Sequence, residues 1–224
     1  MHPFLTPYQR AQFNSTWTAD YMLRAPEKPA QLVILLHGYL LRGEWMYRKL
    51  ERAIPDNAVI LSPSGPFPLI RRKPGEGPSD SLAIGYTWYF YDKNVDEYLI
   101  DMRVGTDFVV NLVRHLKLDT LPTTLIGFSQ GGFLAPSIAS QLKSCRRVVG
   151  IACEFLPDEM EFPVHYRMDQ IHGESDDVVL LADAKKSHDR LRAKGVAGEF
   201  TVIPGLGHKI EDQVRAKIRD ILLS

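Results

Sequence analysis

The chain has 224 residues, 45% hydrophobic and 24% charged, which is typical of a globular protein large enough to bury a full core. Its 27 basic and 27 acidic residues cancel, which argues against a nucleic-acid binder held by bulk charge. No apolar run approaches the ~18 residues of a membrane span, and the first ten residues contain no apolar signal segment. We therefore expect a cytoplasmic protein without an integral membrane segment. Cys145 and Cys153 flank one predicted strand, and we expect buried, reduced thiols rather than a disulfide.

Strands and helices are predicted to alternate along the chain. The strands are expected at 18–23, 31–36, 57–61, 123–126, 147–153, 164–171 and 200–203. The helices are expected at 45–54, 94–118, 133–142, 180–194 and 208–222. The helix over 94–118 is predicted from helical apolar spacing and from an Asn94/Glu97 pair that resembles a capping box. This alternation predicts an α/β fold with a mostly parallel central sheet and helices on both faces.

One serine lies between a predicted buried strand and a predicted helix. The segment Gly127-Phe128-Ser129-Gln130-Gly131-Gly132 fits a strand, a sharp turn and a helix. Such a turn holds the serine in a strained backbone conformation with its hydroxyl exposed, and a Cβ at either flanking glycine would collide with neighbouring backbone. The pattern also fits an ordinary glycine-rich turn, so a catalytic interpretation needs a base and an acid elsewhere in the chain.

Three further strand ends carry candidate partners for Ser129. They are His37-Gly38-Tyr39, His172-Gly173-Glu174-Ser175-Asp176-Asp177 and Gly205-Leu206-Gly207-His208. In a doubly wound sheet the active site lies at the carboxyl ends of the strands. An acid near 176 and a base at 208 give the order serine, acid, histidine, which is the order of the α/β-hydrolase fold. Glu174, Asp176 and Asp177 all compete for the role of the acid, whereas His37 and His172 are expected to be structural.

These stretches make the chain resemble the phospholipase/carboxylesterase family of α/β-hydrolases, which includes the acyl-protein thioesterases. The resemblance covers about residues 31–222 and is most specific from Gly127 to Gly132. It favours Asp176 over its rivals, because the spacing His-Gly-x-x-Asp matches the family. After Gly38 the family usually continues Leu-Gly-Asp, whereas this chain has Tyr39-Leu40-Leu41, and the region around Trp88 lacks a clear counterpart.

The expected enzyme is a single α/β-hydrolase domain over 1–224 that cleaves carboxylic esters or thioesters. Ser129 is the expected nucleophile, His208 the general base and Asp176 the acid that orients it. Backbone N–H groups of Tyr39 and Gln130 are expected to form the oxyanion hole. We expect no cofactor and no metal, and a small-molecule or acyl-chain ester as substrate. The oligomeric state is left open, a homodimer included.

Residues 62–93 are expected to form a lid or substrate loop, because the stretch is long, aromatic and rich in proline and glycine. Leu40, Leu41, Phe67 and Trp88 are expected to line an acyl-binding groove. The alternative is that Trp88 is a core residue under the loop. Two other functions also stay open: a small-ester or peptidase-like hydrolase on the same scaffold, and a ligand-binding protein without turnover.

Overall fold

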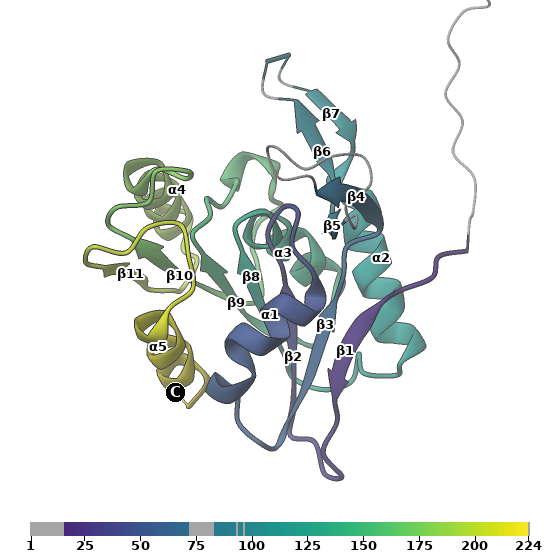
Figure 1. Cartoon of the computed structure of the whole chain (residues 1–224). Helices are drawn as coiled ribbons and strands as arrows, with labels where there is room; N and C mark the ends of the chain where they lie inside the picture. Colours follow the sequence, from purple (N-terminus) through teal and green to yellow (C-terminus); the bar gives the residue numbers. More distant parts are fainter. Residues whose placement is uncertain (1–15, 72–82, 93, 96, 224) are drawn as a thin grey trace, which may run out of the picture.

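A seven-stranded sheet runs through the centre of the molecule, with strand order β1-β3-β2-β8-β9-β10-β11 (Figure 1). The structure is a computed structural model that describes residues 16–71, 83–92, 94–95 and 97–223. Neighbouring strands of this sheet are parallel except at the β1 edge, where β1 runs antiparallel to β3. The strands are β1 (Tyr21–Arg24), β2 (Gln31–Leu36), β3 (Ala58–Pro63), β8 (Thr123–Phe128), β9 (Cys145–Ile151), β10 (Arg167–Gly173) and β11 (Phe200–Ile203).

Helices cover both faces of this sheet, as the near-continuous apolar sequence of β2 requires. Along β2, Leu32 and Leu36 face the core under α2, α3 and α4, whereas Val33 and Leu35 face the core under α1 and α5. The helices are α1 (Gly43–Leu50), α2 (Met102–His115), α3 (Gln130–Gln141), α4 (Leu181–Ala193) and α5 (Asp212–Leu223), with short 3₁₀ turns η1 (Glu51–Ala53) and η2 (Pro157–Glu159). The predicted α/β fold with a mostly parallel sheet is therefore confirmed. Cys145 and Cys153 are both buried free thiols, also as expected.

The helix predicted over 94–118 is wrong in its first two turns. Residues Glu97–Ile100 form strand β7, which pairs antiparallel with β6 (Phe90–Asp92). Leu99, one of the residues that suggested the helix, is 62% exposed rather than part of the core. Helix α2 begins only at Met102, where the Asp101 side chain caps it by accepting a hydrogen bond from the Arg103 N–H at 2.7 Å. The predicted Asn94/Glu97 cap is therefore replaced by Asp101.

The stretch 62–93 holds more regular structure than its sequence suggests. Strand β4 (Phe67–Arg71) and strand β5 (Ala83–Thr87) form an antiparallel hairpin beside the main sheet. Residues 72–82 and Lys93 of this stretch lie outside the described residues. The hairpin is tied to the main body by an isolated bridge between Leu41 and Tyr86. Among the described residues, no helix combines the length and apolarity needed to cross a membrane.

Candidate active site

Ser129 lies in a strained turn between β8 and α3. Its φ and ψ are 49° and −121°, in a region that residues with a Cβ rarely adopt. Its N–H donates to the Ile151 carbonyl at 2.9 Å, which ties the turn to β9. A Cβ at Gly127 would lie 2.3 Å from the Gly131 carbonyl oxygen, and one at Gly131 would lie 2.4 Å from the Leu36 carbonyl oxygen. The sequence requirement for glycine on both sides of Ser129 is thus steric.

Asp176 is the carboxylate that meets His208. His208 Nδ1 lies 2.9 Å from Asp176 Oδ2 and 3.1 Å from Oδ1. The Asp176 side chain is fully buried, and its Oδ1 also accepts the N–H groups of Val178 at 3.0 Å and Val179 at 2.9 Å. Because the carboxylate is held by the backbone of its own turn, it presents a fixed acceptor to the imidazole.

The two competing acids lie elsewhere. Glu174 is exposed, and its carboxylate accepts the Gly205 N–H at 3.0 Å. Asp177 is also exposed, although it directly follows the buried Asp176. His172 is buried and donates from Nε2 to the Val179 carbonyl at 2.8 Å, the backbone bond expected of a structural histidine. Of the three candidate acids, therefore, Asp176 is the one that contacts His208.

His208 is packed next to the serine elbow. Its ring lies 5.0 Å, centroid to centroid, from the ring of Phe128, the residue before Ser129. Since Nδ1 is engaged by Asp176, Nε2 is the ring nitrogen that remains to accept a proton. The serine, the histidine and the carboxylate, which are far apart in sequence, thus gather at the carboxyl ends of β8, β10 and β11.

The loop after β2 lies beside Ser129. A Cβ built on Gly38 would be 3.3 Å from Ser129 Cβ, so the 38–39 peptide runs next to Ser129. Leu40 has a positive φ of 59°, which the Tyr86 carbonyl stabilises by accepting the Leu40 N–H at 3.0 Å. A strained backbone braced by a neighbouring strand fixes the direction of the loop's N–H groups.

His37 fixes the orientation of this loop through two hydrogen bonds of its ring. Its Nδ1 donates to the Gly38 carbonyl at 2.7 Å, and its Nε2 accepts the Gly65 N–H at 2.9 Å. In a trans peptide the C=O and N–H point in opposite directions, so this bond turns the Tyr39 N–H away from the His37 ring. Burial lowers the pKa of His37 to about 4, although the bond to Gly38 opposes the shift. The ring is therefore neutral at pH 7, as an accepting Nε2 requires.

Gln130 binds the segment after β5 through its side chain, a role that sequence reasoning missed. Its Oε1 accepts from the Thr87 hydroxyl at 2.9 Å and from the Trp88 N–H at 3.2 Å. Its Nε2 donates to the Tyr89 carbonyl at 3.0 Å. The residue after Ser129 thus fastens residues 87–89 to the elbow. No local sequence signal marks this contact, because its two halves are more than 40 residues apart.

Trp88 does not line a groove, which corrects the expectation from sequence. It is 0% exposed, its ring lies 4.6 Å from that of His37, and its Nε1 donates to the His37 carbonyl at 2.8 Å. Gly105 of α2 makes room for it, since a Cβ there would lie 2.7 Å from the Trp88 carbonyl oxygen. Trp88 is thus a core residue under the loop, the alternative that the sequence left open.

The other three predicted groove residues are half-buried. Leu41 packs toward the core under α1 and α5, and Phe67 makes an edge contact with Trp17 at 5.7 Å. Leu40 contributes its backbone to the contact with β5. More apolar surface is offered by Tyr39, expected from the sequence for its backbone N–H, and by Val178 and Leu180, which the sequence did not indicate. Tyr39 is 51% exposed, Val178 65% and Leu180 57%, and they lie in the two loops that contain Gly38 and Asp176.

The parallel sheet, the serine elbow and the chain order Ser129, Asp176, His208 define an α/β-hydrolase. Comparison with known sequences gives the family. Residues 90–223, more than half of the chain, match the phospholipase/carboxylesterase family, and the chain belongs to that family.

Individual relatives are more distant. The chain is 29% identical over 125 residues to acyl-protein thioesterase 1 homolog 1 of Dictyostelium discoideum, a match covering 50% of this chain and 54% of that protein. The match therefore spans about half the length of this curated relative. Among solved structures, esterase PE8 superposes with a TM-score of 0.72 at 20% identity, over 92% of this chain and 98% of that one. The acyl-protein thioesterase 2 of Zea mays superposes with a TM-score of 0.68 at 19% identity, over 93% and 98% of the two chains. At these identities the structural likeness concerns the fold.

Proposed function

We propose that the protein is a serine hydrolase that cleaves carboxylic esters or thioesters through an acyl-enzyme on Ser129. The observation that carries the proposal is the His208–Asp176 pair, which lies beside the strained Ser129 turn and leaves Nε2 of the histidine available. Membership of the phospholipase/carboxylesterase family supports the same reaction class.

In the first half of the reaction, Ser129 Oγ attacks the substrate carbonyl carbon while His208 Nε2 takes the hydroxyl proton. The charge that forms on the imidazole is stabilised by the buried Asp176 carboxylate, which also holds the ring in the tautomer with hydrogen on Nδ1. The carbonyl oxygen becomes an oxyanion that accepts the backbone N–H groups of Tyr39 and Gln130. Losing one such donor typically costs about 3–4 kcal/mol of barrier.

In the second half, the carbon–oxygen or carbon–sulfur bond breaks and His208 returns its proton to the leaving alcohol or thiol. Water then gives a proton to His208 and attacks the acyl carbon, and the free acid leaves as Ser129 regains its hydrogen. The cycle consumes one ester or thioester and one water, and it returns Ser129 and His208 to their starting protonation states.

The acyl side of the substrate is proposed to contact the exposed apolar side chains of Tyr39, Val178 and Leu180. These lie in the loops that carry Gly38 and Asp176, and their exposed fractions leave surface for an alkyl chain. Half-buried Leu40 and Phe67 extend this apolar surface toward the β4–β5 hairpin, which we propose as its cover. Each methylene buried there would contribute about 0.8 kcal/mol.

A substrate panel tests the proposal. p-Nitrophenyl esters and acyl-thioesters of increasing chain length should be hydrolysed by the wild-type protein, and Ser129→Ala should abolish hydrolysis of both. The variant should melt at no lower temperature than the wild type, since alanine removes one hydroxyl. Hydrolysis of the panel by Ser129→Ala at the wild-type rate would overturn the assignment of the nucleophile. A wild-type protein that turns over none of these substrates would instead favour a ligand-binding role.

A further inference from the structure

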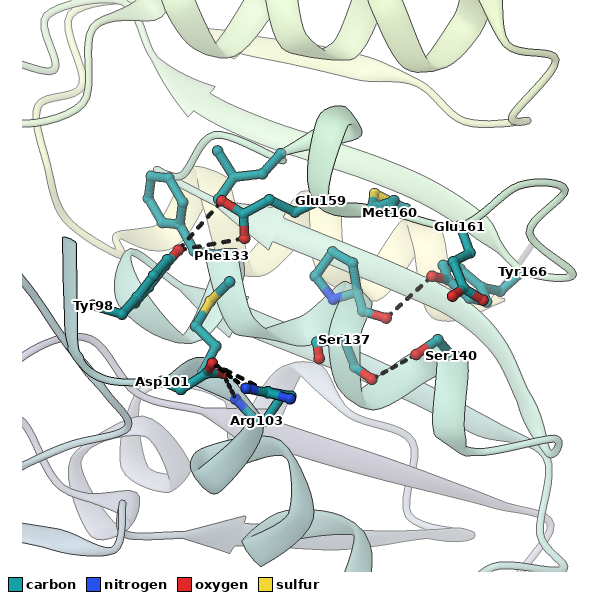
Figure 2. A pocket seen from close by; sticks show the side chains of 13 residues that line it. Tyr98, Asp101, Arg103, Phe133, Ser137, Ser140, Glu159, Met160, Glu161 and Tyr166 are labelled. Atoms are coloured by element: carbon teal, nitrogen blue, oxygen red, sulfur yellow. Dashed lines mark hydrogen bonds and ion pairs between the residues drawn. The ribbon is translucent and has the colours of Figure 1, made fainter. Parts of the chain in front are cut away.

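A cavity of 310 Å³ lies along the outer side of α3 (Figure 2). Its floor is formed by α3, from Phe133 to Ser140, and its walls by the end of β7, the start of α2 and the segment 156–161 around η2. Phe133 is one helical turn beyond Ser129, and its N–H donates to the Ser129 carbonyl at 3.2 Å. The cavity therefore begins one turn from the proposed nucleophile and continues away from it, so that its middle, at Ser137, is ~12 Å from Ser129 along the helix axis.

Three of the four hydroxyl groups that line this cavity donate their hydrogens to the protein. Tyr98 donates to both carboxylate oxygens of Glu159 at 3.4 Å, Tyr166 to the Pro136 carbonyl at 3.1 Å and Ser140 to the Ser137 carbonyl at 2.8 Å. Figure 2 marks these bonds with dashed lines. Each of these three oxygens keeps lone pairs but no free hydrogen. The fourth hydroxyl, that of Ser137, accepts from the Thr106 hydroxyl at 2.9 Å and keeps its own hydrogen. The hydroxyl groups of the lining therefore offer mainly acceptors to a ligand.

The charge of the lining is negative. Three carboxylates (Asp101, Glu159 and Glu161) face one guanidinium, that of Arg103, which donates from Nε and Nη2 to Asp101 at 3.1 and 2.9 Å. Among the described residues, no cationic side chain forms an ion pair with Glu159 or Glu161. Glu159 and Glu161 are both exposed at the residue level. Partial desolvation of the Glu159 carboxyl, with a contribution from Asp101, raises its pKa, whereas the hydrogen bond from Tyr98 opposes the shift. A bound cation would relieve both the burial cost and the repulsion.

We propose that this cavity binds a primary ammonium or guanidinium group carried by the leaving-group side of the substrate. The inference rests on the proposed hydrolase function. A cationic donor group matches acceptors and carboxylates, whereas an alkyl chain would strip water from Glu159 and Tyr98 without replacing it. The rings of Phe133 and Tyr98 also line the cavity, and a cation that sits over the face of an aromatic ring is attracted by it. The acyl chain then takes the apolar surface around Tyr39 and Val178, and the leaving group takes the cavity.

Two ester series with one fixed acyl group test this division. In the first, the alcohol ends in an ammonium group on an arm of about eight to ten carbons, long enough to span the ~12 Å to mid-cavity. In the second, a methyl group replaces the ammonium. One charge-assisted hydrogen bond that survives desolvation is worth roughly tenfold or more in affinity, so kcat/KM should favour the ammonium ester by about tenfold. In the double variant Glu159→Gln/Glu161→Gln, which keeps side-chain shape, this ratio should fall to about one.

The controls separate the cavity from general electrostatics and from the chemistry. Glu27→Gln removes an exposed charge at the turn between β1 and β2, at the opposite end of the sheet, and should leave the ratio as in the wild type. A third series that carries the ammonium on the acyl chain should show no preference; a preference there instead would overturn the leaving-group assignment. Equal hydrolysis of ammonium and methyl esters by the wild type would overturn the cavity proposal alone. Failure to hydrolyse any ester would overturn the proposed function together with the inference built on it.

Discussion

The side chain of Gln130 offers a test of how the elbow is held. Gln130→Ala removes the hydrogen bonds to Trp88 and Tyr89 at 3.2 and 3.0 Å. The Thr87 hydroxyl lies 2.9 Å from Gln130 Oε1, but its single hydrogen also reaches the Tyr89 carbonyl at 2.8 Å and keeps that acceptor in the variant. At about 1 kcal/mol for each of the two bonds lost, the free energy of unfolding should fall by about 2 kcal/mol. For a chain of this length each kcal/mol corresponds to roughly 2–4 °C, so the melting temperature should fall by about 4–8 °C. Because alanine keeps the backbone N–H proposed for the oxyanion hole, kcat should fall less than the roughly 10²–10³-fold typical of losing such a donor.

Calorimetric melting and ester kinetics measure the two effects separately. Gln141→Ala is the matched control, because Gln141 lies on the same helix but is exposed and donates one bond, to Asp107 at 3.2 Å. It should change stability by no more than about 0.5 kcal/mol. Gln130→Glu keeps the accepting oxygens and loses the donor to the Tyr89 carbonyl, so its melting temperature should be intermediate. If Gln130→Ala melts no lower than Gln141→Ala, the Gln130 side chain does not hold residues 87–89 against the turn at Ser129.

Three further predictions follow from burial and charge. Trp88→Ala should cost about 3–5 kcal/mol of stability and lower activity on short and long acyl esters alike; a selective loss on long chains would instead restore a groove role for Trp88. The pKa of His37 is 6.5 in the unfolded chain and about 4 in the folded protein. As the pH drops below 6.5 the unfolded chain therefore takes up this proton before the folded protein does, and the free energy of unfolding falls by about 2 kcal/mol at pH 5. Urea melts at pH 7 and pH 5 should show this loss in the wild type and not in His37→Gln. Asp176→Asn should lower kcat by orders of magnitude and Asp177→Asn by little; the reverse order would identify Asp177 as the acid.

The sequence predicts the parts of this protein whose signals are local. The buried strands read as continuous apolar runs, and the glycines around Ser129 mark a turn that only small residues permit. The chain order of serine, acid and histidine is that of the α/β-hydrolase fold, in which the strand ends that carry these three residues lie close together. The structure places His208 against Asp176, the acid that the sequence favoured, although Glu174 and Asp177 lie within two residues of Asp176 in the chain.

What the sequence could not predict depends on contacts between distant segments. Val95 and Leu99 have helical spacing relative to α2, yet they lie on the β6–β7 hairpin and are 59% and 62% exposed. Aromatic content cannot distinguish a groove from a core, so the burial of Trp88 follows only from its packing on His37 and against Gly105. The cavity on α3 likewise joins segments that lack any common sequence signal.

Trapping the proposed acyl-enzyme on Ser129 is the decisive experiment. The protein is mixed with a p-nitrophenyl ester, quenched in acid within the first turnover and digested for mass spectrometry. We expect an acyl mass on the peptide that contains Ser129, matched in amount by a burst of nitrophenol, with no adduct in Ser129→Ala. An acyl group found on another residue, or hydrolysis by Ser129→Ala at the wild-type rate, would contradict it.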